Sequence, residues 1–133
     1  MPFAHERLHV YQLAINFVVW ADDLITAMPT GAAVKNQLDR ASTSVPLNIA
    51  EGNAKFSTRD RVRYLQIACG SALECAACLD VVVAKRLRNA TEVAPGKTML
   101  EMIVNQLYGL RRRLEPDVVQ EEPAGYSEGA GTV

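Results

Sequence analysis

The feature that most constrains the fold is an apolar repeat through the middle of the chain, from Thr58 to Leu87. Apolar residues recur there every three or four positions, which is the spacing of one face of an α-helix. They are Val62, Leu65, Cys69, Ala72, Ala76, Leu79 and Val83, and Ala68, Leu73, Cys75, Val82 and Leu87 widen the face. A helix of roughly 30 residues is about 45 Å long. One short partner cannot cover it, so we expect several comparably long helices to pack along it.

Three further segments have the same periodicity, and no segment alternates in the manner of a β-strand. They span residues 8–28, 33–50 and 99–114, and Ser57 with Asp60 resembles a capping box at the start of the central helix. Residues 89–96 are interpreted as a connector. We therefore predict one domain over residues 1–114, an all-α, antiparallel, up-and-down four-helix bundle.

Charge is distributed unevenly, although the net charge is only -1. All 14 lysines and arginines precede Glu115, whereas the segment 115–133 contains acids and no base. This segment is also Gly-rich and aperiodic, so we expect a disordered acidic tail. The overall balance argues against a strongly basic nucleic-acid-binding protein but permits a local basic patch.

Compartment and processing signals are weak. No stretch approaches the roughly 18 uncharged apolar residues of a membrane-spanning helix, and the first residues lack a signal-peptide pattern. The odd number of cysteines, 3, favours reduced thiols. These features predict a cytoplasmic protein without a membrane partner.

The pattern H-E-x-x-H occurs at His5, Glu6 and His9. On a helix this spacing places two histidines one turn apart, where they bind zinc while the glutamate activates water. The match lies at the start of the chain without a third ligand, so a solvated first turn is favoured. A metal-dependent hydrolase is the least favoured hypothesis.

Cys75 and Cys78 form a C-x-x-C pair inside the central apolar segment. Redox pairs lie at a helix N-terminus, whereas these two lie about five turns into the predicted helix. We interpret them as small apolar residues that allow close helix packing. The chain also lacks nucleophile-elbow, P-loop and dinucleotide-binding motifs. We therefore predict no catalytic residue, no metal and no cofactor.

Basic residues cluster where the central helix begins and can contact nucleic-acid phosphates. The candidate nucleic-acid-binding residues are Lys35, Arg40, Lys55, Arg59, Arg61 and Arg63. Ordinary solvated charge is the alternative, since bases at a helix N-terminus oppose its dipole. The run at 111–113 is explained by its favourable place at a helix C-terminus.

The segment 44–52 combines a proline, an amide and an acid in helical register. Pro46 lacks a backbone amide, so we expect a kink or a loosened turn there. Glu51 is disfavoured at a helix C-terminus, so we expect a base of the next helix, such as Arg63, to hold it. The residues interpreted as structural rather than catalytic are Pro46, Asn48, Glu51 and Gly52.

This segment carries a resemblance to a known family. The run SVPLNIAEG, the preceding QL-x-RA and the following YLQIACGSALE resemble the bacterial four-helix-bundle family named for 23S rRNA intervening-sequence proteins, once called S23 ribosomal proteins. The opening L-x-VYQ-x-A also fits, so the resemblance covers about Leu8 to Leu114. The family is also similar to the accessory protein of diversity-generating retroelements, a homopentameric barrel with a basic surface that binds nucleic acid.

The resemblance implies a cytosolic bundle that assembles into a ring, a pentamer, without catalytic residues. Asp39 stands at a position that is usually basic in the family. This residue and the acidic tail both lower the positive potential that a nucleic acid would meet. Two main hypotheses follow: a non-enzymatic oligomer that binds RNA or DNA backbones through its basic edge, and an assembly scaffold or adaptor that recruits another protein. If the tail shields that edge, removing the residues after Leu114 should strengthen nucleic-acid binding.

Overall fold

The computed structural model describes residues 2–121 of the chain. The elements are the 3-10 helix η1 (Ala4–Arg7) and the helices α1 (His9–Ala27), α2 (Ala33–Asn53), α3 (Thr58–Ala84) and α4 (Ala90–Glu121). No strand occurs in the described range, and the predicted all-α four-helix bundle is confirmed. The predicted tail falls largely on residues 122–133, which lie outside the described residues.

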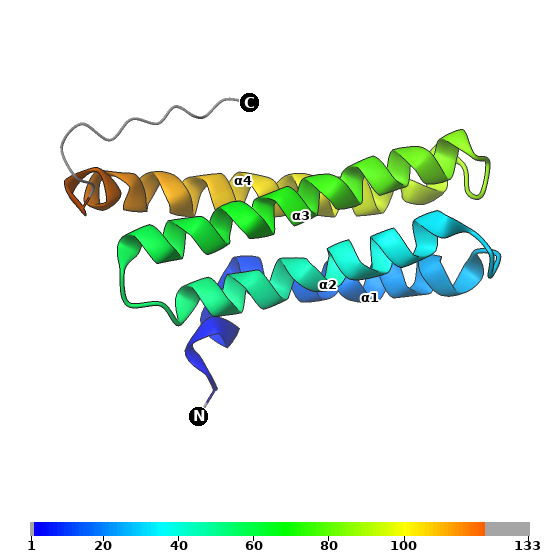
Figure 1. The fold of residues 1–133 in the computed structure, drawn as a ribbon. Helices are drawn as coiled ribbons and strands as arrows, with labels where there is room; N and C mark the ends of the chain where they lie inside the picture. The colour runs from blue at the N-terminus through cyan, green and yellow to red at the C-terminus, as the bar shows by residue number, and fades with distance from the viewer. Residues whose placement is uncertain (1, 122–133) are drawn as a thin grey trace.

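Successive helices run in opposite directions and are joined by short loops at 28–32, 54–57 and 85–89 (Figure 1). Each helix packs against its neighbour in the chain, and α1 also packs against α4, whereas in the described range the backbones of the diagonal pairs do not approach closely. One end of the bundle therefore holds the start of α1, the end of α2, the start of α3 and the described end of α4.

The core lies along the predicted apolar faces. The largest side chains withdrawn from solvent include Phe17, Leu38, Ile49, Leu79, Ile103 and Leu107. Burying one such side chain stabilises the fold by about 1.5–3 kcal/mol. Leu73, predicted to widen the apolar face of α3, is instead 50% exposed, because it stands at the outer rim of the groove between α3 and α4.

The interpretation of residues 89–96 as a connector is wrong, since α4 begins at Ala90. The Asn89 side chain accepts a hydrogen bond from the Glu92 amide (2.8 Å), and the Glu92 carboxylate accepts one from the Asn89 amide (2.9 Å). This reciprocal cap starts the helix before Pro95. Gly96 is buried in the next turn, where a Cβ would overlap the indole ring of Trp20.

The last helix also continues beyond the predicted end of the bundle at Leu114, through Pro116 to Glu121. Proline removes one backbone donor, here the one that would reach the Arg112 carbonyl. Arg112 and Pro116 are both exposed, so water can satisfy that carbonyl at little cost.

Pro46 is buried inside α2, which runs without interruption to Asn53. The hydroxyls of Ser42 and Thr43 both donate to the Asp39 carbonyl, at 3.0 and 2.8 Å. One turn later, the Asn48 amide group donates to the carbonyl and hydroxyl oxygens of Ser44, both at 2.9 Å. Side-chain hydrogen bonds are thus made in the turns around Pro46, which has no backbone amide to donate.

The third helix combines high apolarity with partial burial. Within the described chain it alone is long and apolar enough, by length and composition, to cross a membrane, with a hydropathy of 1.8 over 18 residues. The core helix of a soluble bundle has the same character, and 39% of that window is buried here. Ile67, Leu73 and Val81 leave apolar surface exposed on its outer face.

Gly52, predicted to stop the helix, lies in its last turn and allows α2 to approach α3 closely. A Cβ there would lie 2.8 Å from Tyr64 Cβ and 3.4 Å from the Arg61 carbonyl oxygen. Neither atom is the free end of a flexible side chain, so the helices would have to separate.

We expect Gly52→Ala to lower the free energy of unfolding by up to about 2 kcal/mol. The overpacking costs about 1–3 kcal/mol, which exceeds the roughly 1 kcal/mol that alanine gains over glycine in a helix. Gly109→Ala is the matched control, since no atom lies within 4 Å of its Cβ position, and should raise stability by about 0.5–1 kcal/mol. Urea denaturation measures both, and stabilisation by Gly52→Ala would contradict the close approach.

Candidate nucleic-acid interface

Basic side chains from four segments gather where α2 passes into α3. We call this surface the basic end; it comprises Arg7, Lys55, Arg59, Arg61, Arg63, Arg111, Arg112 and Arg113. Shared cavities join its parts, because Arg7 and Arg113 line one groove while Arg61 and Arg113 line another. Among the side chains that the structure describes, the acids of the same region are Glu6, Glu51, Asp60 and Glu115. Bases outnumber acids there, so the local charge is positive.

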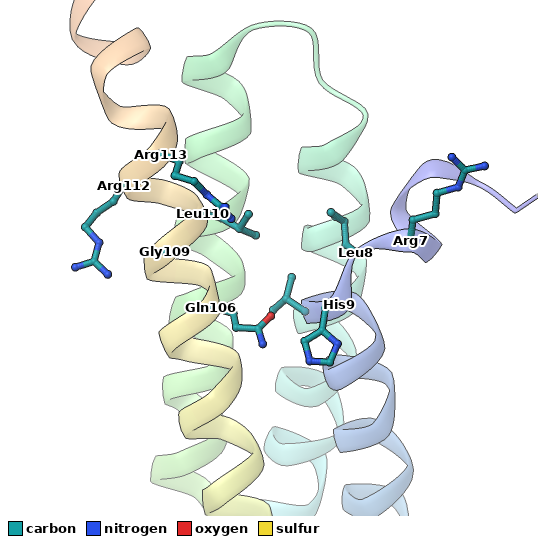
Figure 2. A pocket seen from close by; sticks show the side chains of 9 residues that line it. Arg7, Leu8, His9, Gln106, Gly109, Leu110, Arg112 and Arg113 are labelled. Carbon is teal, nitrogen blue, oxygen red and sulfur yellow. The ribbon is translucent and has the colours of Figure 1, made fainter.

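The larger groove, of about 680 Å³, separates the start of α1 from α4. Figure 2 shows Gln106 and Arg113 directed into the gap from α4, with His9 on the α1 side. Arg7 and Arg112 point away from the gap on its two sides. The groove therefore presents cationic groups both within it and along its rims.

A smaller cavity of about 210 Å³ adjoins the groove and shares Leu8, Leu110 and Arg113 with it. Its other lining residues are Ile49, Gly52, Asn53, Arg61, Leu65 and Leu114. Apolar side chains from α2, α3 and α4, with Leu8 just before α1, thus meet two guanidinium groups. This combination suits a ligand that has both an apolar and an anionic part.

Tyr64 organises the cations at the start of α3. Lys55 Nζ and Arg63 Cζ each lie 5.2 Å from the centroid of its ring, within cation–π range. Lys55 Nζ also lies 3.0 Å from Glu51 Oε2. The hydrogen bond and charge of Glu51 raise the pKa of Lys55, so this amine is charged at neutral pH.

The expectation that Arg63 holds Glu51 is therefore wrong. The partner is Lys55, four positions along the chain, because the turn that follows α2, in which the Lys55 amide donates to the Gly52 carbonyl, keeps both side chains on one side. Arg63 lies instead over the Tyr64 ring. Of the four residues interpreted as structural, Pro46, Asn48 and Gly52 make packing or hydrogen-bonding contacts between turns and helices, whereas Glu51 is exposed.

The structure does not bring all six candidate binding residues together. Lys35 lies at the opposite end of the bundle, where its ammonium donates to the Met28 carbonyl (3.2 Å). Arg40 is exposed on α2 between the two ends. At the basic end, Arg61 Nε donates to the Lys55 carbonyl (2.9 Å) and so fixes the loop between α2 and α3.

Several residues of the basic end were not foreseen as part of one site. Arg7, Arg112 and Arg113 join it only because the chain crosses the bundle four times and returns the last helix to the first. Arg111 Nε lies 3.1 Å from Glu115 Oε2, an ion pair without hydrogen-bond alignment. The aromatic residue Phe56 at the loop was missed too, although its position beside Lys55 was a visible signal.

The H-E-x-x-H segment does not form a metal-binding turn. His5 and Glu6 belong to η1, and Leu8 is extended (φ -78°, ψ 125°) before α1 begins at His9. The Glu6 carboxylate accepts a hydrogen bond from the Phe3 amide (3.2 Å), and the His5 ring packs edge-on against Tyr11 at 4.8 Å. The two histidines thus do not share one helical face, which the zinc motif requires. Across residues 2–121 no group of three His, Cys, Asp or Glu is placed to hold a metal.

The three cysteines are free and buried in α3. Burial raises the pKa of Cys75 to about 12, with smaller effects from Cys78 and Glu74. Burial likewise raises the pKa of Cys69 and Cys78. Their thiols are therefore protonated and weakly nucleophilic near neutrality, in agreement with a packing role for the C-x-x-C pair.

Comparisons with known proteins agree with this architecture. Residues 6–109 match the family model described as 23S rRNA-intervening sequence protein. The fold is similar to a crystal structure of a protein of unknown function from the S23 ribosomal protein family of Bacteroides thetaiotaomicron, with a TM-score of 0.73 and 20% identity. That match covers 77% of this chain and 97% of the other. A search of curated proteins finds no match.

Proposed function

The chain belongs to the 23S rRNA-intervening sequence protein family, and on this premise we propose that it is a non-enzymatic, self-associating protein that binds nucleic-acid backbones through its basic end. The observation that carries the proposal is the convergence of basic residues from four segments on one end of the bundle. Phosphate contacts of this kind depend on charge and not on base sequence. Such a protein acts in the cytoplasm, where structured RNA is abundant.

The electrostatics support binding rather than structural stabilisation as the role of these charges. Arg59 lies in the first turn of α3, where the helix dipole disfavours positive charge by about 0.3–1 kcal/mol, and Arg61 and Arg63 follow it as this effect falls off. Arg111–Arg113 do not gain from the dipole of α4, because this helix continues to Glu121 and its last turn contains no base, so the favourable helix-end position expected from the sequence is wrong. A polyanion spanning both groups would offset their mutual repulsion.

Self-association is supported by the outer face of α3. Ile67, Leu73 and Val81 remain 42%, 50% and 39% exposed on a helix that otherwise forms the core. A second copy covering this face would remove apolar area from water at about 25 cal/mol per Å². The family resemblance implies a ring of five copies. The same exposed face supports the alternative, an adaptor that recruits a different protein.

We expect structured RNA to bind at about 50 mM salt, with an affinity that falls steeply as salt rises. Arg63→Ala should weaken binding and reduce the slope of log K against log salt by about 1, and adding Arg59→Ala should reduce it further. Lys35→Ala is the matched control, since Lys35 lies at the other end. Fluorescence anisotropy measures all four proteins. Unmeasurable affinity at low salt, or an equal loss in the Lys35 variant, would refute the proposal.

Removing residues 122–133 should tighten this binding by roughly 2- to 10-fold at low salt, because Glu122 and Glu128 reduce the positive potential that the nucleic acid meets. The cut is placed after Glu121 rather than Leu114, so that α4 stays complete. The gain should vanish near 0.5 M salt. Truncation that leaves low-salt affinity unchanged would show that the tail does not shield the basic end.

We expect the wild-type protein to sediment as a multimer and Leu73→Glu to sediment as a single chain, because a buried carboxylate is costly at an apolar contact. Val19→Glu, at a side chain 59% exposed on α1, is the matched control and should leave the particle mass unchanged. Sedimentation velocity at about 10 μM gives the masses. A monomeric wild type that captures one stoichiometric protein from nuclease-treated lysate would favour the adaptor instead.

A further inference from the structure

Phe56 is the most exposed large apolar side chain in the described part of the protein, at 102% of its reference area. It lies in the loop at 54–57, at the tip of the basic end. An aromatic ring contributes to stability through burial, and this ring has none in the single chain. Any favourable interaction of the ring therefore has to come from a bound partner.

The loop holds this ring outward. On one side, the Lys55 amide donates to the Gly52 carbonyl (3.1 Å), and its own carbonyl accepts from Arg61 Nε (2.9 Å). On the other side, Ser57 Oγ accepts from the Asp60 amide (3.0 Å) as the cap of α3. Both chain neighbours of Phe56 are thus anchored to helices. The loop is short and pinned, so the ring loses little backbone freedom when a ligand contacts it.

Basic residues lie on both sides of Phe56 in the sequence. Lys55 precedes it directly, and Arg59 and Arg63 follow on one face of α3. Lys55 and Arg63 are both held at 5.2 Å from Tyr64, which keeps two positive groups near the loop. Asp60 and Glu51 are the acids nearby, and Glu51 is engaged by Lys55.

An aromatic ring among phosphate-binding cations has the chemistry of a stacking platform for nucleobases. Bases inside a continuous duplex are already stacked, and separating them costs a few kcal/mol per step. Unpaired bases in loops, bulges and single strands expose their faces at no such cost. A lipid surface is less suited, because the residues beside Phe56 in the loop are Ala54, Lys55 and Ser57, which offer little apolar area.

We infer that Phe56 stacks on an unpaired base while the neighbouring cations contact its flanking phosphates, so that the basic end selects single-stranded or looped segments over continuous duplex. This inference rests on the proposed function and deepens it by naming the class of nucleic acid. It assigns sequence-independent affinity to the cations and strand-state selectivity to the ring.

The test compares two probes with the same phosphate number, a twelve-residue oligothymidylate and a twelve-residue abasic strand, with a duplex of equal length as a third. We expect the full-length wild type to bind the oligothymidylate more tightly than the abasic strand by about 5- to 150-fold, the range for one stacked base. Phe56→Ala and Phe56→Leu should both lose that preference and keep the affinity for the abasic strand. Phe56→Leu is the matched control, since it keeps an apolar side chain but has no ring.

Phe56→Trp should retain the preference, and its indole fluorescence should be quenched by the oligothymidylate but not by the abasic strand. Thermal unfolding should be unchanged in all three variants, because the side chain is exposed. Equal wild-type affinity for the two strands, full preference in Phe56→Leu, or a change of particle mass in Phe56→Ala would overturn the inference while leaving the proposed function standing. Failure to bind any of the three probes, or structured RNA, at about 50 mM salt would instead refute the proposed function.

Discussion

The bundle depends on the burial of α3 along its length. This helix has 27 residues, so it is about 40 Å long, and its inner face is apolar throughout. Only helices of similar length that run beside it can cover that face, and α2 and α4 do so on its two flanks. Short loops then make neighbouring helices antiparallel. The positions of all four helices, and of the residues at their ends, follow from this requirement.

The basic end is a consequence of that arrangement. Two crossings bring the start of α3 to the same end of the bundle as the start of α1, and the final crossing returns α4 to that end, so arginines distant in sequence share cavities. Charges of one sign gathered at one end of the bundle repel each other, and the dipole of α3 adds to the cost at Arg59. Tyr64 and Glu51 reduce this cost locally, through cation–π contacts and an ion pair. The remaining excess of positive charge is what makes this end, rather than another, the candidate for a polyanion.

Much of the architecture was predictable because helical periodicity and core burial have the same physical origin. The apolar positions of the second helix, Val34, Leu38, Ala41, Val45 and Ile49, are all buried as the spacing predicts. The predicted start of the last helix was wrong because Pro and Gly residues occur both in loops and inside helices. Pro95 and Gly96 are typical of a loop, yet Asn89 caps a helix before them and Gly96 is where Trp20 packs. Sequence spacing cannot tell a glycine that ends a helix from one that admits a neighbouring ring.

In the candidate site, too, some residues were predictable from the sequence and others were not. Lys55, Arg59, Arg61 and Arg63 are close in the chain, and the sequence alone identified them as a basic cluster, along with the four helices and their inward faces. Only the tertiary structure decided that Arg7, Arg112 and Arg113 join them and that Lys35 does not. Local contacts repeat with the helical period and can therefore be inferred from spacing. Contacts between helix ends depend on how often the chain crosses the bundle and on where each helix begins and ends. Spacing did not reveal those bounds, since Asn89 starts α4 before Pro95 and the helix then continues through Pro116.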